Sequence, residues 1–394
     1  MADDTQVDWI SSIKAADEEL RAFVRLADDL PDQRPAITLG VKDIIDVAGL
    51  PTECGSPICE GQMPPSTASC VKILQGAGAT VVGKTVTTEY ATTKPGPTCN
   101  PLNAAYSPGG SSSGSAAGVS AGLFDWALGT QTAGSVIRPA AFCGIVGFLP
   151  SAGRIPRDGV RVMSPTLDRV GVFAREVAGV EAMLSAFPGW APEALPERPL
   201  RLALLPRAAW AAADEATRNV ILAAADVLRA EGHEVTELSD PAPFEEMMAA
   251  QKTVMGYEIP RALTWELEHH RDLLSDELRD YCDASLGISH LDYAAALETA
   301  DRFRLLCQGM SASCDAVMGP AAAQLAPEGL SWTGDPFVNR IWSLFKLPAV
   351  CLPGAPSANG LKGSVQFNAG AGRDSFLCTL AGRLAPLIAT VGPD

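Results

Sequence analysis

The sequence predicts an α/β fold in which a β-sheet is covered by helices on both faces. Apolar segments with strand character alternate with helical patterns from one end of the chain to the other, and this alternation is typical of such folds. The chain has 394 residues, of which 47% are hydrophobic and 19% charged, so it can bury a large core. We therefore expect an enzyme-like globule rather than a disordered chain.

The first third of the chain alternates between helices and strands. Apolar residues recur at three- and four-residue spacing from residue 9 to residue 30, which predicts one amphipathic helix that ends at the prolines of 31–35. The elements that follow are a buried strand over 37–41 with Lys42 at its end, a helix over 66–75 capped by a serine, a strand over 79–83 and a small-residue helix from about 115 to 121.

The remaining two thirds continue the same alternation. A strand, a helix and a strand are predicted over 200–205, 214–230 and 234–238, and a mostly helical, charged region follows over 245–310. Beyond a stretch rich in Pro, Gly and Ala near 319–335, strands over 349–353 and 363–367 precede a last helix that begins near residue 375. No repeat of solenoid length interrupts this pattern.

Charge and cysteine usage exclude several classes of function. The net charge is −16 and no basic stripe is visible, so nucleic acid is not expected as a partner. No signal peptide and no membrane-spanning run of apolar residues is recognised. The ten cysteines are scattered and never form a C-x-x-C pair, which favours reduced thiols and a cytoplasmic protein.

Two serine-bearing stretches and one lysine are the candidate catalytic segments of this chain. They are Gly40-Val41-Lys42-Asp43, Pro108 to Ser115 and Gly129 to Ser135. A serine hydroxyl is a poor nucleophile until a neighbouring base takes its proton. Lysine, serine and serine in this order can form a proton relay that needs no histidine. The sequence therefore indicates a hydrolase that attacks an acyl carbon, foremost that of an amide.

Residues 78–85 match the phosphate-loop pattern G-x-x-x-x-G-K-T. A phosphate loop follows a strand and opens a helix. Here a helix precedes the motif, and its interior is itself a strand. We therefore expect no nucleotide site at this motif.

Residues 118–122 match the nucleophile-elbow pattern G-x-S-x-G, which requires a hydrophobic strand directly before its serine. Gly, Ser and Ala stand there instead.

No histidine has metal-ligand spacing with another histidine or with a cysteine, and we expect neither a metal nor any other cofactor. The glycine-serine run 109–115 is flanked by apolar segments, so we expect a structured loop that approaches the substrate closely and not a flexible linker.

From Gly40 to Ala174 the chain resembles the amidase signature family of serine hydrolases. The resemblance rests on the lysine motif, residues 76–85, Asn100-Pro101, the glycine-serine loop, residues 129–144 and residues 167–171. Residues 331–353 resemble the closing region of malonamidase-like members. The resemblance implies a single amidase domain over 1–394 with a central mixed β-sheet, and a signature catalytic core at about 36–180.

The resemblance also assigns the catalytic residues. It implies that Ser135 is the nucleophile, Ser111 the bridging serine and Lys42 the base, with the backbone amides of Thr132, Ala133, Gly134 and Ser135 as the oxyanion hole, and a cis peptide bond at Ser111. Lysine is almost wholly charged at neutral pH unless it is desolvated. A lysine at the end of a buried strand meets that demand. Asp43 and Asp46 are expected to point away from the amine.

Two residues near the site depart from the family pattern. Ala133 replaces a usual glycine, which matters if that position needs a positive φ. Leu149 replaces a common lysine, and we expect this change to be structural.

The substrate is predicted to be a small amide that carries a free carboxylate. Arg138 stands three residues after Ser135, as in malonamidase-like relatives, where it is associated with binding a substrate carboxylate. Its planar guanidinium suits such a group. A pairing of Arg138 with an internal acid such as Asp168 is the alternative at this point.

Other functions stay open at the sequence level. The chain is alternatively the amidase subunit of a glutamine-dependent amidotransferase, which passes ammonia to a partner. A non-catalytic binding protein is disfavoured because Lys42, Ser111 and Ser135 are all present. A homodimer is compatible with the apolar composition.

Overall fold

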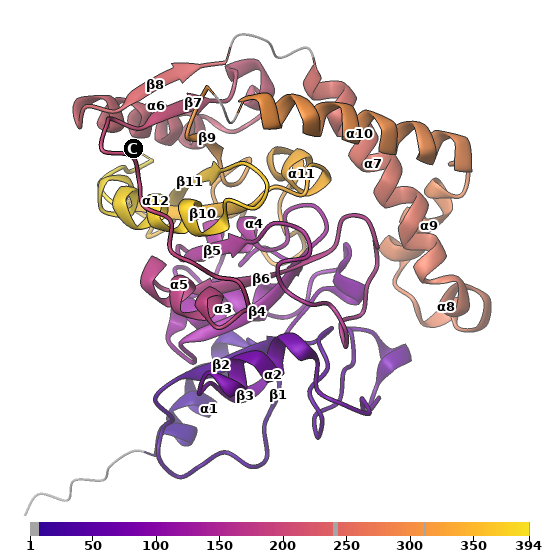
Figure 1. The fold of residues 1–394 in the computed structure, drawn as a ribbon. Coiled ribbons are helices and arrows are strands. Elements are labelled where there is room, and N and C mark those ends of the chain that lie inside the picture. The colour runs from indigo at the N-terminus through magenta and orange to yellow at the C-terminus, as the bar shows by residue number, and fades with distance from the viewer. Residues whose placement is uncertain (1–7, 239–242, 311–312, 394) are drawn as a thin grey trace, which may run out of the picture.

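The computed structural model describes residues 8–238, 243–310 and 313–393, and it confirms the predicted α/β fold with one large mixed sheet (Figure 1). The sheet has 11 strands in the order β1-β3-β2-β4-β6-β5-β10-β11-β9-β7-β8. The strands are β1 Phe23–Leu26, β2 Thr38–Lys42, β3 Thr80–Thr85, β4 Trp126–Gln131, β5 Val146–Leu149, β6 Arg169–Ala174, β7 Arg201–Leu204, β8 Glu234–Glu237, β9 Ala316–Pro320, β10 Ala349–Pro356 and β11 Lys362–Asn368.

Helices pack against this sheet and extend beyond it. They are α1 Trp9–Leu20, α2 Ser69–Gly76, α3 Ser113–Ala121, α4 Ile137–Phe142, α5 Val177–Ser185, α6 Glu215–Ala230, α7 Pro243–Ala262, α8 Thr264–His269, α9 Asp276–Ser285, α10 His290–Met310, α11 Phe337–Leu344 and α12 Asp374–Ile388. Short 3-10 helices lie at Pro57–Cys59, Glu89–Ala91, Arg207–Trp210 and Arg271–Leu273.

The direction of the central strands brings two predicted motifs together. β2 pairs in parallel with both β3 and β4, whereas β4 and β6 are antiparallel. In the register of β2 and β4, Val41 lies opposite Leu128. Because neighbouring parallel strands end at the same edge of a sheet, the carboxyl ends of β2 and β4 place Lys42 beside the loop that follows Gln131.

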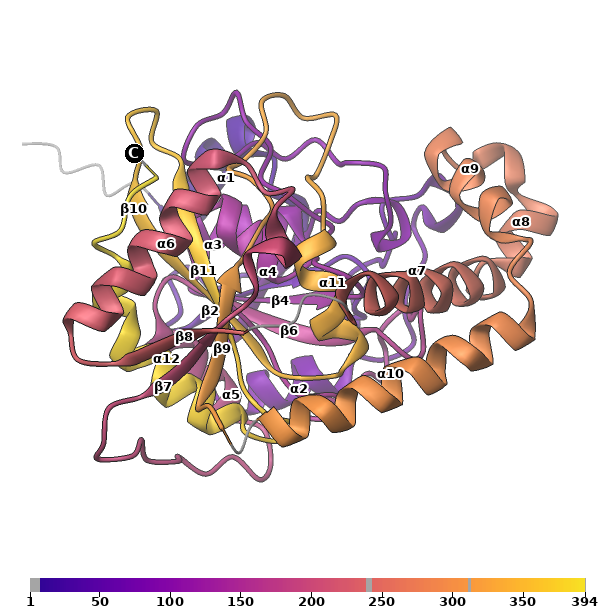
Figure 2. The same ribbon diagram turned by 90° about the horizontal axis from the view of Figure 1, so that it is seen from above.

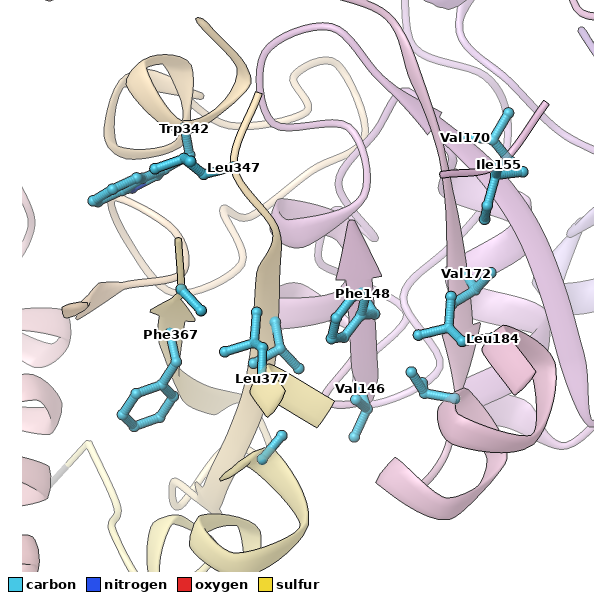
Figure 3. Close-up of a cluster of buried hydrophobic side chains, with 14 of the residues drawn as sticks. Val146, Phe148, Ile155, Val170, Val172, Leu184, Trp342, Leu347, Phe367 and Leu377 are labelled. Atoms are coloured by element: carbon cyan, nitrogen blue, oxygen red, sulfur yellow. The ribbon is translucent and has the colours of Figure 1, made fainter. Parts of the chain in front are cut away.

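Alternating side chains along the strands fill two separate cores, one on each face of the sheet. Val170 and Val172 of β6 belong to the larger cluster, and Phe173 next to them belongs to the smaller one. Figure 3 shows part of the larger cluster, where Phe148, Val172, Leu184 and other side chains from β5, β6 and α5 gather with residues of β11 and α12. Helices α3 and α4 cover the opposite face. The strands that position the candidate functional residues are therefore buried on both faces.

A helical arm stands beside the sheet and supplies one wall of the candidate site. α10 packs along α7, and α7 also contacts α9 and α11. In Figure 2, α7 and α10 run away from the sheet toward α8 and α9. This arm corresponds to the helical region predicted over 245–310.

Most predicted elements are confirmed to within a few residues, but the predicted helix over 9–30 is too long. α1 ends at Leu20 because Arg21 adopts a left-handed conformation with φ 54°, and the Asp17 carboxylate accepts a hydrogen bond from the Ala22 amide at 2.7 Å. The chain then forms β1, which pairs with β3. The predicted serine cap of the second helix is also wrong, since Ala68 is the N-cap and makes no side-chain cap bond.

Two further properties concern the chain as a whole. Eight of the cysteines that the structure describes are free thiols; they are Cys54, Cys59, Cys70, Cys99, Cys143, Cys282, Cys351 and Cys378. Within the described ranges, no helix combines the length and the apolar character that a membrane crossing requires.

Candidate active site

A cavity of about 200 Å³ lies between the strand ends and the helical arm. One wall comes from the loop after β4 and the start of α4, another from α7, α9 and α11, and the rim from two loops. The lining residues are Ala91, Thr92, Thr93, Thr132, Ala133, Ser135, Arg138, Met255, Ile259, Tyr281, Trp332, Thr333, Gly334, Pro336 and Arg340. The predicted nucleophile and the predicted carboxylate-binding arginine therefore share one cavity.

Lys42 is fully buried and contacts hydroxyl groups. Its Nζ lies 2.7 Å from Ser111 Oγ and 2.9 Å from Thr130 Oγ1. Burial lowers the pKa of Lys42 to about 7, and the charge of Asp168 opposes this shift. A substantial fraction of the amine is therefore neutral at pH 7, and a neutral amine can accept a proton.

The glycine-serine loop is ordered and buried, as predicted. The Gly110–Ser111 peptide bond is cis, which agrees with the family resemblance. Gly109 has φ 78°, and a Cβ added there would lie 2.9 Å from the Cα of Pro139. The Ser111 carbonyl accepts a hydrogen bond from the Thr88 amide at 3.2 Å. These contacts fix the Ser111 hydroxyl beside Lys42.

Ser135 follows β4 and precedes α4. Its side chain is 8% exposed and faces the cavity. Within the described chain, its hydroxyl makes no hydrogen bond. Catalytic hydrogen bonds often form only when substrate is bound, so the contact from Ser111 to Ser135 belongs to the proposed mechanism below.

The loop from Thr132 to Ser135 is held so that its amides are left free. Gln131 Oε1 accepts hydrogen bonds from the Val136 and Ile137 amides at 2.9 and 3.1 Å. Ser343 donates to the Ala133 carbonyl at 3.0 Å and accepts from Gln131 Nε2 at 3.1 Å. Among the residues that the structure describes, no acceptor is paired with the amides of 132–135. These four donors are available to a developing oxyanion.

Asp168 contacts the start of the oxyanion loop and not Arg138, the partner considered for it in the sequence analysis. It accepts hydrogen bonds from Thr132 Oγ1 at 2.5 Å and from the Met163 and Ser164 amides at 2.7 and 3.0 Å. Burial raises the pKa of Asp168 despite these bonds. Its carboxylate holds the Thr132 side chain at the start of the oxyanion loop, so the alternative in which Asp168 pairs with Arg138 is wrong.

Arg138 is 5% exposed and binds carbonyl groups in place of an acid. Its Nε donates to the Thr333 carbonyl at 2.7 Å, and one terminal nitrogen donates to the Gly110 carbonyl at 2.7 Å. The other terminal nitrogen is buried and has no hydrogen-bond partner in the described chain. Burial and the nearby Arg340 lower the pKa of Arg138 to about 9. The guanidinium therefore connects the glycine-serine loop to the loop that contains Thr333.

Asp43 points away from Lys42, as expected. Its carboxylate lies 2.9 Å from Lys84 Nζ and 3.1 Å from the Glu53 amide. Lys84 belongs to the phosphate-loop-like motif, and the structure confirms that this motif is a strand: Lys84 lies in β3 with a fully buried side chain. Ser120 of the elbow-like motif lies in α3 and donates to the Cys143 carbonyl at 2.7 Å.

The two departures from the family pattern are accommodated without strain. Ala133 is not among the residues with positive φ, so that position does not need a glycine here. Leu149 is fully buried in β5 and pairs with Ala349 of β10. Among the described residues, no group of three or more His, Cys, Asp or Glu side chains is arranged to hold a metal ion.

Comparison with known proteins gives consistent matches. The profile of the Amidase family matches residues 35–378. A glutamyl-tRNA(Gln) amidotransferase subunit from Methanospirillum hungatei JF-1 is 45% identical over 159 residues, which are 39% of this chain and 37% of that protein. The chain thus aligns with less than half the length of the curated relatives it matches.

Solved structures match over nearly the whole chain. A crystal structure described as an amidase superposes with a TM-score of 0.86 at 25% identity, covering 96% of this chain and 94% of the other. The peptide amidase PAM, solved in complex with the competitive inhibitor chymostatin, gives a TM-score of 0.79 at 26% identity, with 98% and 94% of the two chains covered.

Proposed function

The chain belongs to the amidase family of C–N hydrolases, and from this premise we propose that it cleaves a small, carboxylate-bearing amide through a Ser-Ser-Lys relay and an acyl-enzyme. The observations that carry the proposal are the buried contact of 2.7 Å between Lys42 Nζ and Ser111 Oγ and the position of Ser135 in the lining of the cavity. A lysine without a carboxylate partner in a desolvated site is suited to act as a base.

The relay moves one proton in each direction. Ser135 Oγ attacks the amide carbon while its proton passes to Ser111 and the proton of Ser111 passes to neutral Lys42. Ser111 then donates a proton to the leaving nitrogen and regains one from Lys42, which releases ammonia or an amine. Water attacks the acyl-enzyme by the same route, and the acid leaves as Ser135 regains its proton.

The free amides of 132–135 stabilise the tetrahedral intermediate in this mechanism. They point to no internal acceptor among the described residues, so they need no rearrangement when charge develops on the substrate oxygen. Removal of one such preorganised donor typically costs roughly 3–4 kcal/mol. Asp168 and Ser343 act as positioning residues because they hold the loop from Thr132 and from Ala133.

The cavity favours an anionic substrate. Arg138 lines it, and one terminal nitrogen of this guanidinium is buried without a hydrogen-bond partner among the described residues. Of the described residues that line the cavity, none is an acid. A substrate carboxylate would supply the missing acceptor and would lie one helical turn from Ser135.

A second candidate function is the amidase subunit of a glutamine-dependent amidotransferase. The curated relatives with 45% and 39% identity are named as subunits of glutamyl-tRNA(Gln) amidotransferase. Glutamine is itself a small amide with a free carboxylate, so the same cavity chemistry applies to its amide and carboxylate ends. The two functions differ in whether glutamine is preferred and in whether the ammonia is passed to a partner protein.

Ammonia release by the purified chain separates these functions. The substrates are small amides of matched length with and without a free carboxylate, and glutamine. We expect turnover that favours the carboxylated amides and vanishes in Ser135→Ala. Turnover that survives in Ser135→Ala contradicts the relay. A preference for neutral or aryl amides is compatible with the Ser-Ser-Lys mechanism but rules out the requirement for a carboxylate on the substrate. Turnover confined to glutamine favours the amidotransferase function.

A further inference from the structure

A buried carboxylate of the helical arm, Glu258 of α7, binds the loop that precedes β6. Glu258 is 6% exposed. Its Oε2 accepts hydrogen bonds from the Ser164 hydroxyl and, at 3.1 Å, from the Thr166 amide. Its Oε1 accepts from the Thr166 hydroxyl at 2.5 Å and from the Tyr293 hydroxyl of α10 at 2.7 Å. An ionised carboxylate only accepts hydrogen bonds, and here all four of its partners donate.

The loop over residues 163–168 folds back on the Asp168 carboxylate. The Met163 and Ser164 amides donate to this carboxylate at 2.7 and 3.0 Å. The Leu167 and Asp168 amides donate to the Ser164 carbonyl at 3.1 and 2.9 Å. Ser164 therefore bonds to Glu258 through its hydroxyl and to Asp168 through its backbone. A displacement of Ser164 would displace the Asp168 carboxylate with it.

The other side of the Asp168 carboxylate contacts the oxyanion loop. β4 and β6 are antiparallel with Gln131 opposite Arg169, so Thr132 after β4 lies beside Asp168 before β6. The Thr132 hydroxyl donates to Asp168 Oδ1 at 2.5 Å. Thr132 also carries the first of the four free amides. A continuous series of hydrogen bonds thus leads from Glu258 in the arm to the first oxyanion donor.

The same turn of α7 forms part of the cavity wall. Met255 and Ile259 line the cavity, and Glu258 lies between them in the sequence. α10 packs along α7 (Figure 2), and the ring of its Tyr293 stacks on the Tyr257 ring with centroids 4.2 Å apart. Glu258 therefore connects the wall that a substrate touches to the loop that stabilises its oxyanion.

We propose that Glu258 is a positioning residue of the reaction: through Ser164 and Asp168 it fixes Thr132 and so sets the geometry of the oxyanion hole. The inference rests on the proposed amidase function. Oxyanion donors act because they are in place before charge develops, and a misplacement of about 1 Å costs roughly 100-fold in rate. An interaction made only in the transition state affects kcat and leaves KM unchanged.

Three variants test this role. Glu258→Gln keeps the size of the side chain but replaces one acceptor oxygen by a donating NH2 group, among partners that all donate. Ser164→Ala removes the hydroxyl that joins the loop to Glu258 and keeps the backbone bonds to Asp168. It carries the test if Glu258→Gln does not fold. Glu246→Gln is the matched control, because Glu246 is exposed on the same helix and pairs with Arg302 of α10.

The kinetic test uses an amide that wild type turns over. Glu258→Gln should lower kcat by roughly 10- to 100-fold with KM within about twofold, because hydrogen bonds to a charged acceptor contribute in that range. Ser164→Ala should lower kcat by about three- to tenfold. Glu246→Gln should match wild type. A loss in Glu258→Gln that appears in KM with kcat unchanged overturns the positioning role.

A double-mutant cycle with Thr132→Val separates positioning from a merely structural role. This substitution removes the hydroxyl that Asp168 holds and keeps the Thr132 backbone amide. Residues that act through one contact are not additive. In the Thr132→Val background, Glu258→Gln should therefore lower kcat by no more than about twofold. The full loss in both backgrounds would show that Glu258 does not act through Thr132.

Labelling with an alkyl fluorophosphonate distinguishes failure of this inference from failure of the amidase function. Ser135 Oγ forms a bond to phosphorus, fluoride leaves, and the serine proton passes to the relay, so no amide substrate is needed. Intact mass follows the rate. Wild type should be labelled, Ser135→Ala should not, and Glu258→Gln should react at least tenfold more slowly than Glu246→Gln. Equal rates in these two variants overturn the positioning role alone. A wild type that reacts no faster than Ser135→Ala contradicts the amidase function and the positioning role with it.

Discussion

Two fully buried lysines on neighbouring strands have opposite surroundings. Lys42 ends β2, and Lys84 lies on β3, opposite Val41 in the parallel register. Lys84 pairs with the Asp43 carboxylate and also donates to the Pro51 carbonyl and the Thr52 hydroxyl. Among the described residues, Lys42 contacts two hydroxyl groups and no carboxylate oxygen. Burial without a carboxylate partner lowers the pKa of Lys42, whereas Lys84 is held in an ion pair.

The surroundings of the two lysines are connected through Asp43. This residue follows Lys42 directly, in the turn after β2. Lys84 holds the Asp43 carboxylate on the far side and neutralises it. Burial raises the pKa of Asp43 to about 6, and Lys84 opposes that shift. The ion pair between Lys84 and Asp43 therefore shields Lys42, the proposed base, from a charge that would keep it protonated.

Loss of Lys42, the proposed base, should have the largest effect. Lys42→Met leaves the relay without a base, and we expect kcat/KM to fall by about 10²- to 10⁴-fold. In wild type, only the neutral amine is active, and its pKa is about 7. The kcat/KM should therefore rise about tenfold per pH unit below 7 and level off above it. A pH profile that is flat from 5 to 9 contradicts the role of Lys42.

Loss of the structural lysine should mainly affect stability. Lys84→Met leaves the Asp43 carboxylate buried without its cation, and breaking a buried pair in this way costs about 3–5 kcal/mol. Urea unfolding followed by circular dichroism measures the loss. The double variant with Asp43→Asn removes both charges and should regain most of the stability. A Lys84→Met protein within about 1 kcal/mol of wild type would show that the pair contributes little.

The pH dependence of stability should also distinguish the two lysines. The pKa of Lys42 is about 7 in the folded chain and near 10.5 when unfolded. Between these values the unfolded chain binds a proton that the folded chain does not. The contribution of Lys42 to the free energy of unfolding therefore rises with pH, by about 1.4 kcal/mol per unit.

Lys42→Met lacks this contribution and should be the more stable protein at pH 7. Its advantage over wild type should shrink as pH increases from 7 to 9. Other groups titrate alike in both proteins, so their effects cancel in the difference. Urea midpoints and m-values at pH 7, 8 and 9 give the comparison. A constant difference would mean that the pKa of Lys42 is not lowered by folding.

Local sequence patterns predicted the parts of the site that lie on short motifs. Lys42 at a strand end, the ordered loop around Ser111 and the position of Ser135 each follow from a few consecutive residues. β4 and β6 were not predicted as strands. β4 contains Ala, Gly and Gln, and β6 begins with Arg169, whose buried guanidinium donates to three carbonyl groups and so is tolerated in the core.

The opposite wall of the cavity could not be predicted in the same way. Tyr281 and Arg340 are single residues, more than 140 positions beyond Ser135, and no spacing rule connects them to it. Tertiary packing of α7, α9 and α11 brings them together. The signal that could have indicated Arg340 is the resemblance of residues 331–353 to the closing region of malonamidase-like members.

The homodimer stays a prediction. Light scattering of the purified chain measures the oligomeric state.

The smallest effect is expected from the second hydroxyl that contacts Lys42. Thr130→Val keeps the shape of the side chain in β4 and removes the contact of 2.9 Å with Lys42 Nζ. Lys42 then keeps only Ser111 as a hydroxyl partner and can rotate away from it. One neutral hydrogen bond contributes about 1 kcal/mol, so kcat/KM should fall about three- to tenfold. Thr130→Ser keeps the hydroxyl and serves as the control. If Thr130→Val keeps full activity, the hydroxyl does not contribute, and orientation of Lys42 rests on Ser111 alone.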